Sequence, residues 1–328
     1  MEFYLFPSGN GLEDFMSADS NILLLPLCFF GLYMILEAAD WGLCLAAPLV
    51  SRNEEENHAI LGLLKPGLDG NELWFFLGMF MMGAAIPSLS QQLAGTRTVM
   101  IVLVALGALL RLAACFGKKF LGKSWMMKLN AAFSVIVLAV LGLISSSLLM
   151  EGGSLISAIG IFTALWLILS AFQLGSLYGA VKVVNPLGER FRASFLVSSV
   201  LNVVVYIILA ILLKNHAAES NLYGSFFWIS LVATAILFAL AFFFTRTRHV
   251  KVGLAAVYFS SFFAIAIYLS AYAVMLPAHF TVELDSLKNA MDGLPGTALL
   301  IMAFVWTLGT FIWRQIRRKE TYEWKDHI

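Results

Sequence analysis

Two carboxylates stand inside an otherwise apolar stretch near the start of the chain. Glu37 and Asp40 are three residues apart, so they share one face of a helix. An ionisable group within a membrane span is costly and usually marks a pathway, an ion pair or a site. Two carboxylates this close in a low dielectric tend to share a proton, as a proton relay requires. The alternative is a buried structural pair, satisfied by a neighbouring arginine or by water. The relay role is favoured more for Glu37 than for Asp40, which is nearer the end of the span.

A second polar cluster runs from Lys65 to Trp74. Its proline and glycines predict a tight turn, after which a helix starts. Asp69 is placed to cap that helix. Its other interpretation is a carboxylate at the mouth of a channel that passes protons towards Glu37. The residues assigned to the turn and the helix start are Gly70, Asn71, Glu72 and Trp74.

A weaker polar signal lies further along the chain. Gln173 and Ser176 share a helix face beside Gly175 and Gly179. The two glycines have the GxxxG spacing, which favours close helix packing in membranes. Packing is therefore the preferred interpretation of this segment.

The elements that carry these residues must be membrane helices. Of the 328 residues, 60% are hydrophobic and 12% charged, about half the charge of an average soluble domain. A spanning helix needs ~20 mostly apolar residues. The sequence therefore predicts an all-α polytopic membrane protein with nine transmembrane helices. The predicted spans are residues 21–49, 72–93, 98–116, 131–150, 154–181, 194–213, 224–245, 252–276 and 297–313.

Lysines and arginines gather in alternate loops and in the tail, which predicts the orientation. Because such residues collect on the cytoplasmic side, the N-terminus is expected outside and the C-terminus in the cytoplasm. The expected organisation is an extracytoplasmic extension over 1–20, a membrane domain over 21–313 and a cytoplasmic basic tail over 314–328. The longest outer connection, 277–296, predicts a short surface helix or cap. The net charge of +1 gives no indication of a nucleic-acid partner.

Metal and haem ligands are not expected on this chain. No Cys/His metal spacing is present, and the three cysteines fall in apolar runs. Membrane haems are held by His or Met within or near the spans. The histidines fall instead in loops, span ends and the tail: His58, His216, His249, His279 and His327.

Two motifs together resemble subunit II of cytochrome bd quinol oxidase. The run Leu36–Gly42 is similar to the Leu-Glu-Gly-Phe-Asp-x-Gly pattern of that family, and Arg52 follows it. The run Pro66–Trp74 resembles the family's Gly-Pro-x-Trp-Asp-Gly-Asn-Glu-x-Trp pattern. Departures are Ala38 and Ala39 in place of Gly-Phe, and Leu68 in place of Trp. Weaker likenesses are Tyr178, Lys182, Gly188-Glu189, Arg192-Ala193, and the stretch from Met275 through Asp285 to the basic tail.

The resemblance implies a nine-helix subunit, built as two four-helix bundles plus one peripheral helix, in a heterodimeric oxidase of the bacterial or archaeal inner membrane. The partner, subunit I, would bind haems b558, b595 and d and the quinol. This chain would contribute a cytoplasmic proton pathway through Glu37 and Asp69, with Asp40 accompanying them. A small single-helix accessory subunit and a structural quinone occur in some members.

Two other functions stay open on the sequence alone. One is a proton-coupled transporter with Glu37 as its coupling carboxylate. It is disfavoured because no second Gly/Pro-broken span carries a carboxylate. The other is a homologous scaffold subunit in a different redox complex.

Overall fold

The computed structural model describes residues 18–64, 71–88, 124–149, 154, 156–183, 186–216, 223–279 and 283–316, with isolated positions between 98 and 109. This part of the chain is helical and contains no β-strand, which confirms the all-α prediction there. The helices are α2 (Ala18–Val50), α3 (Glu54–Leu63), α4 (Asn71–Ala85), α8 (Ser124–Ser147), α9 (Ala158–Lys182), α10 (Leu187–His216), α11 (Tyr223–Arg246), α12 (Val250–His279), α13 (Leu284–Asp292) and α14 (Leu294–Ile316).

Six of these helices are long and apolar enough to cross a membrane: α2, α8, α9, α10, α11 and α12. A seventh candidate span arises if α13 and α14, bent by 58°, count as one. The predicted span 72–93 corresponds to α4, whose 15 residues are short for a full crossing. The predicted span 98–116 lies mostly outside the described residues. The total of nine spans therefore stays a prediction.

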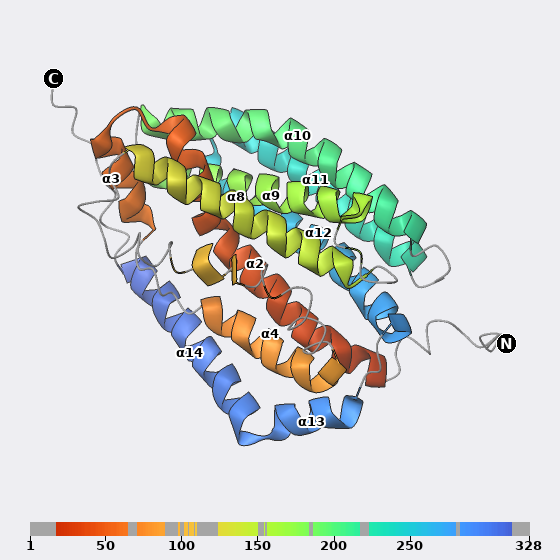
Figure 1. Ribbon diagram of the computed structural model, residues 1–328. Coiled ribbons are helices and arrows are strands. Elements are labelled where there is room, and N and C mark those ends of the chain that lie inside the picture. The colour runs from red at the N-terminus through yellow and green to blue at the C-terminus, as the bar shows by residue number, and fades with distance from the viewer. Residues whose placement is uncertain are drawn as a thin grey trace.

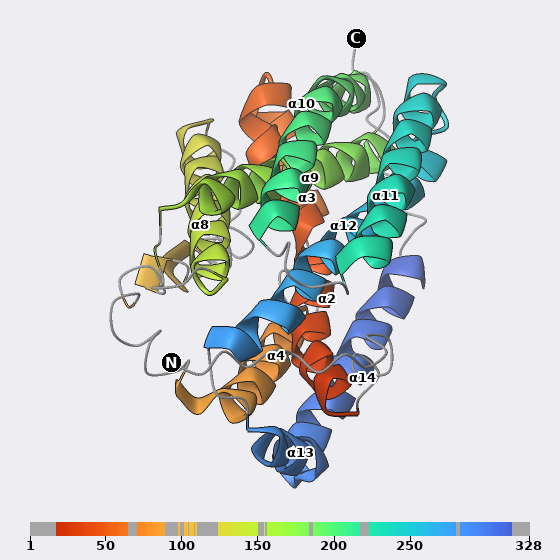
Figure 2. The same ribbon diagram turned by 90° about the vertical axis from the view of Figure 1, so that its right-hand side faces the viewer.

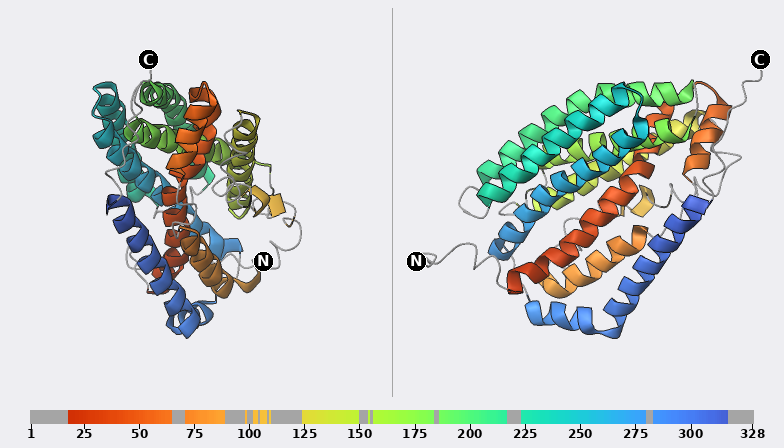
Figure 3. Two further views of the ribbon diagram at one scale, coloured as in Figure 1. Left: turned by 90° about the vertical axis from the view of Figure 1, so that its left-hand side faces the viewer. Right: turned by 180° about the vertical axis from the view of Figure 1, so that it is seen from behind.

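α2 is the central helix of the molecule (Figures 1 and 3). It packs against α9, α8 and α12 on one side and against α4 on the other. Beyond α9 and α12 lie α10 and α11, and beyond α4 lies α14. Because α2 is covered on both sides, Glu37, Ala39 and Asp40 near its middle are buried, so polar groups are placed inside the bundle there.

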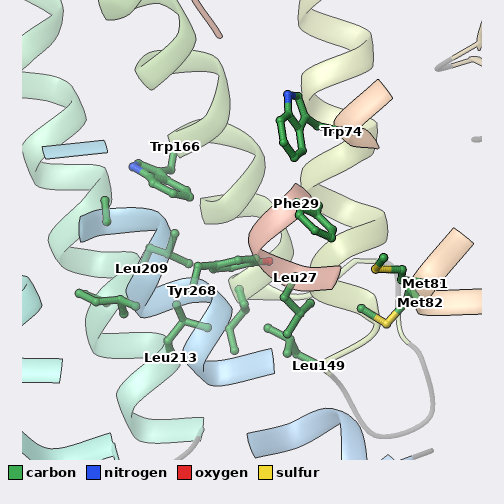
Figure 4. Close-up of a cluster of buried hydrophobic side chains, with 14 of the residues drawn as sticks. Leu27, Phe29, Trp74, Met81, Met82, Leu149, Trp166, Leu209, Leu213 and Tyr268 are labelled. Carbon is green, nitrogen blue, oxygen red and sulfur yellow. The ribbon is translucent and has the colours of Figure 1, made fainter. Parts of the chain in front are cut away.

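Two apolar clusters mark the ends of the helix bundle. One is formed by residues such as Val50, Ile60, Leu187 and Phe191, from α2, α3 and α10, and we call this the Val50 end. The other, around Leu149, joins α2, α4, α9, α10 and α12, and we call this the Leu149 end (Figure 4). Helix packing is thus dense both above and below the middle of α2.

α13 closes the Leu149 end next to α4 (Figure 2). Its Leu287 is fully buried, whereas Asp285 and Lys288 are exposed. The backbone N–H of Glu283, just before the helix, donates to the carbonyl of Ala85 at the end of α4 over 2.7 Å. The short helix predicted within 277–296 is therefore confirmed.

Glycines set the contact between α2 and α9. A Cβ at Gly42 would overlap the backbone of Ala171, and one at Gly175 would overlap the backbone of Gly42. A Cβ at Gly179 would come within 2.8 Å of the Phe191 ring of α10. The packing role predicted for the Gly175/Gly179 pair is confirmed. Small residues let membrane helices approach closely and gain dispersion energy where no hydrophobic force acts between them.

Candidate functional site

Glu37 lies near the middle of α2 and is 1% exposed. Its Oε2 accepts a hydrogen bond from Nδ2 of Asn71, the first residue of α4, over 3.1 Å. The two residues are 34 positions apart in the sequence. The structure therefore brings together the two polar motifs that the sequence singles out.

α4 begins deep in the bundle, beside the middle of α2 (Figure 1). Glu37 and Val50 are thirteen positions apart, or ~20 Å at the helical rise of 1.5 Å per residue. The sequence instead suggested that this helix starts near the end of the first span. Because Asn71 contacts Glu37, the start of α4 supplies a polar partner at a depth where water is scarce.

The other predicted site residues differ in their placement. Asp40 is buried, at 7% exposure, and Glu72 is half-buried. Asp69 and Gly70 lie outside the described residues, as does the rest of the run from Lys65. The structure thus joins Glu37 to Asn71.

Trp74, one turn after Asn71, also anchors the start of α4. Its indole Nε1–H donates to Oγ1 of Thr307 in α14 over 2.8 Å. Its ring also packs against Phe29 of α2, with the ring centroids 5.6 Å apart (Figure 4). A buried indole needs such a partner for its N–H. Trp74 therefore ties α2, α4 and α14 together next to Asn71.

A small cavity borders Glu37 between α2, α8, α9 and α12. Its volume is about 30 Å³. A cavity needs roughly 10–15 Å³ by this measure to hold a water molecule. Its polar lining comes from Glu37, Ser170 and Ser261, set among apolar side chains such as Met34, Ile35, Trp41, Leu138, Trp166 and Ile265. Asp40 does not line it. The space is large enough to hydrate Glu37.

A second buried carboxylate, Glu56, sits at the Val50 end. Asn53 caps α3 by accepting from the backbone N–H of Glu56 over 2.8 Å. Glu56 in turn accepts from the backbone N–H of Arg52 over 2.6 Å and forms an ion pair with Arg190 of α10. The side chain of Arg52, part of the family-like motif, is exposed. The Asn53-x-x-Glu56 spacing is a capping signal, but no local pattern identifies Arg190 as the partner.

Further ion pairs follow on the same end. Arg192 bonds Glu189 over 2.6 Å, one turn apart on α10, and Arg248 approaches Glu189 at 3.8 Å. The ammonium group of Lys182 lies 5.7 Å from the ring centre of Tyr178. All of these residues except Arg248 belong to the weaker family-like patch. The Arg192 and Lys182 contacts lie within single helices, whereas the contact of Arg248 joins the turn after α11 to the start of α10.

The histidines with described side chains lie at helix ends or in the short helix α3. His216 contacts the carbonyl of Leu149 at 3.2 Å, His249 contacts the hydroxyl of Thr247 at 3.3 Å, and His58 is exposed. Over the described ranges, no group of three or more His, Cys, Asp or Glu side chains could hold a metal ion.

Comparison with known proteins gives one family and one fold. Residues 20–315 match the family model described as cytochrome bd terminal oxidase subunit II. No curated protein sequence matches the chain. Among solved structures, the fold is similar to a chain in the structure of bd oxidase from Geobacillus thermodenitrificans, with a TM-score of 0.68 and 12% identity. That alignment covers 92% of this chain and 99% of the other.

Proposed function

The chain belongs to the cytochrome bd terminal oxidase subunit II family, and on that premise we propose that it delivers cytoplasmic protons through Glu37 to a haem-bearing partner subunit. As a family member it is a multi-pass membrane protein and a subunit of a bd-type terminal oxidase complex. The observation that carries the proposal is the buried Glu37, bonded to Asn71 beside a water-sized cavity.

The complex oxidises quinol and reduces oxygen to water, a reaction that consumes protons, without pumping further ones. The haems b558, b595 and d and the quinol site lie in subunit I, so this chain itself ligates no haem. It forms a heterodimer with subunit I, and a single-helix accessory subunit and a structural quinone are further components of the proposal. The complete subunit has nine spans, in two four-helix bundles plus a peripheral helix.

The Val50 end faces the cytoplasm in this proposal. Its support is the excess of lysine and arginine in the loops on that side, including Arg190, Arg192, Arg246 and Arg248. Protons then reach Glu37 from the side on which α3 lies. Asp69 precedes Asn71 by two residues, and Asn71 contacts Glu37, which supports Asp69 as the carboxylate that passes protons inward.

The arrangement around Glu37 suits a group that gains and loses a proton. The Asn71 amide hydrogen-bonds the carboxyl group and fixes its orientation in α2. Water in the adjacent cavity brings a proton within hydrogen-bond reach of the carboxyl group, the geometry that proton transfer requires. Asp40, one turn further towards the Val50 end, lies on the route between Glu37 and the cytoplasm.

Replacement of Glu37 in the assembled oxidase tests this function. We expect Glu37→Ala and Glu37→Gln to lower quinol-dependent oxygen consumption per haem on the order of a hundredfold, the contribution of a positioned proton-transfer group. Reduced-minus-oxidised spectra should show unchanged haem content. Glu54→Ala, an exposed acid at the start of α3, is the control and should leave turnover unchanged. Normal turnover in a fully assembled Glu37 variant would exclude this role.

Asp69→Asn is expected to slow turnover less than the Glu37 variants, since water can partly replace a carboxylate near the channel mouth. If the variant lowers only the yield of assembled complex, Asp69 is a helix cap and not part of the route.

The family match favours this function over the proton-coupled transporter. Purification in mild detergent distinguishes the two directly. The oxidase subunit should copurify with a second polypeptide that carries b- and d-type haem bands, whereas a transporter would purify as a colourless single chain. Copurification with a different redox partner would indicate a scaffold subunit.

A further inference from the structure

A buried amide pair lies between α9 and α10, next to the Glu37 cavity. Gln173 and Asn202 are both fully buried. Nδ2 of Asn202 donates to Oε1 of Gln173 over 2.6 Å and to Oγ of Ser170 over 3.3 Å. Ser170 is one of the cavity-lining residues, together with Glu37. A chain of hydrogen-bonded side chains, Ser170, Asn202 and Gln173, therefore connects the cavity to the interior of the α9–α10 contact, and we call it the thread.

Side chains of the thread and its neighbour Ser176 also carry buried donor and acceptor atoms that are not used in hydrogen bonds within the thread. Within the described part of the chain, Nε2 of Gln173, Oδ1 of Asn202 and Oγ of Ser176 are buried and have no hydrogen-bond partner. Ser176 lies one turn along α9 from Gln173, on the same face. Leaving such a group unsatisfied in an apolar interior costs about 1–3 kcal/mol. Ordered water, with two to four hydrogen bonds each, is the usual partner of such groups.

A purely structural role would need fewer polar atoms. Amide and hydroxyl side chains do link membrane helices, and the Asn202–Gln173 bond alone would serve that purpose. It does not account for Ser170, which faces the cavity, or for the spare donors and acceptors. A water-sized cavity lined by Ser170, together with these spare donors and acceptors, offers the partners that bound water requires.

We propose that Ser170 and Asn202 hold ordered water in the Glu37 cavity, so that protons from the cytoplasmic side reach Glu37 along the contact between α9 and α10. Ser170 contacts this water, and Asn202 is a positioning residue that acts through the Ser170 hydroxyl. Gln173 and Ser176 extend the hydrated thread towards the Val50 end. This inference rests on the proposed proton-carrying role of Glu37.

Substitutions along the thread in the assembled oxidase test the inference. Ser170→Ala removes the hydroxyl at the cavity, and Asn202→Leu removes its positioning donor. Ser199→Ala is the matched control, because Ser199 is a buried serine of α10 that bonds the Phe195 carbonyl and does not line the cavity. Ser170→Thr keeps the hydroxyl and should restore the wild-type behaviour.

Two measurements distinguish a water site from a packing contact. We expect Ser170→Ala and Asn202→Leu to lower haem-normalised turnover about fivefold, the effect of losing one ordinary hydrogen bond from proton transfer. The H₂O/D₂O rate ratio should rise. The infrared carbonyl stretch of the Glu37 carboxyl group, identified by its loss in Glu37→Gln, should shift in both variants and stay in place in Ser199→Ala.

The outcomes separate this inference from the function on which it rests. If Glu37→Gln leaves turnover unchanged, the proposed proton route through Glu37 is wrong, and the inference that depends on it is overturned as well. If Glu37→Gln slows turnover but Ser170→Ala shifts neither the rate nor the carbonyl band, the thread is a packing contact and only the present inference is overturned. If Asn202→Leu assembles poorly, Ser170→Ala still tests the inference, because it removes only the oxygen atom of the same hydroxyl group.

Discussion

The two buried glutamates at Glu37 and Glu56 are held in contrasting ways. Glu56, at the Val50 end, pairs with the guanidinium of Arg190 and also accepts from the backbone N–H of Arg52. Glu37, in the middle of α2, accepts from the neutral amide of Asn71 and borders a cavity of about 30 Å³. Both side chains are less than a tenth exposed.

The difference shows that burial of a carboxylate does not by itself indicate a proton route. Glu56 uses its two oxygens to join the start of α3 to the start of α10, which is a structural task. Glu37 borders a cavity large enough for a water molecule, which is the environment that the proposed proton exchange requires. We therefore expect loss of Glu56 to affect stability and loss of Glu37 to affect turnover.

The largest effect on stability is expected from Glu56→Leu. Removing one partner of a buried ion pair leaves an uncompensated charge, which costs about 3–5 kcal/mol, and the partial exposure of Arg190 favours the lower value. Thermal unfolding of the assembled oxidase in detergent measures the change, and haem-normalised turnover should stay constant. The double variant Glu56→Leu/Arg190→Met should recover most of the stability. A double variant as unstable as the single one would contradict the ion-pair explanation.

Substitution of Gly42 tests how much the close contact between α2, which carries Glu37, and α9 contributes to stability. In Gly42→Ala the new methyl group must displace the backbone of Ala171, so we expect a loss of about 2–3 kcal/mol, within the range for overpacking. Gly83→Ala is the control, because a Cβ there meets no atom within 4 Å. Equal unfolding temperatures for the two variants would show that α2 and α9 separate easily.

The helices could largely be predicted from the sequence, and the reason is physical. In a membrane every backbone polar group must be satisfied within its own segment, so a long apolar run such as 224–245 becomes a helix whatever surrounds it. That run corresponds to α11, and the run 154–181 corresponds to α9. α4 begins at Asn71, one residue from the predicted start, but it has only 15 residues and its first residue contacts Glu37 in the middle of α2, which hydropathy does not predict.

The candidate site was predictable only in part. Glu37 is conspicuous because a carboxylate in an apolar run is costly. Its partner is not, because Asn71 lies 34 positions away and was assigned to a helix start. Gln173 is conspicuous too, but its bond to Asn202 depends on how α9 and α10 pack. Tertiary packing, which has no local sequence pattern, decides both contacts.

Asn71→Leu tests whether the amide matters for Glu37. It removes a donor to the carboxyl group while keeping a side chain of similar size, and we expect haem-normalised turnover to fall about tenfold, the equivalent of ~1.4 kcal/mol in the barrier. Stopped-flow measurement of the oxygen reaction reports the change. Asn53→Leu is the matching substitution beside Glu56. It should lower stability through loss of the α3 cap and leave the turnover rate unchanged. A stability loss without a rate change in Asn71→Leu would place Glu37 in the same structural class as Glu56.

The smallest effect is expected at the tie between α4 and α14. Trp74→Phe and Thr307→Val each remove the 2.8 Å hydrogen bond from the indole to the hydroxyl, while most of the apolar contact is kept. A net hydrogen bond contributes about 1 kcal/mol, so each single variant should lose about that much stability, and the double variant should lose no more than either one. The free energies of unfolding of the four proteins form a double-mutant cycle that measures the coupling. Turnover should change little, because this bond joins α4 to α14 and does not involve Glu37, whereas the Asn71 amide contacts Glu37 directly. Additive losses in the cycle would mean that Trp74 stabilises α4 through its packing on Phe29 alone.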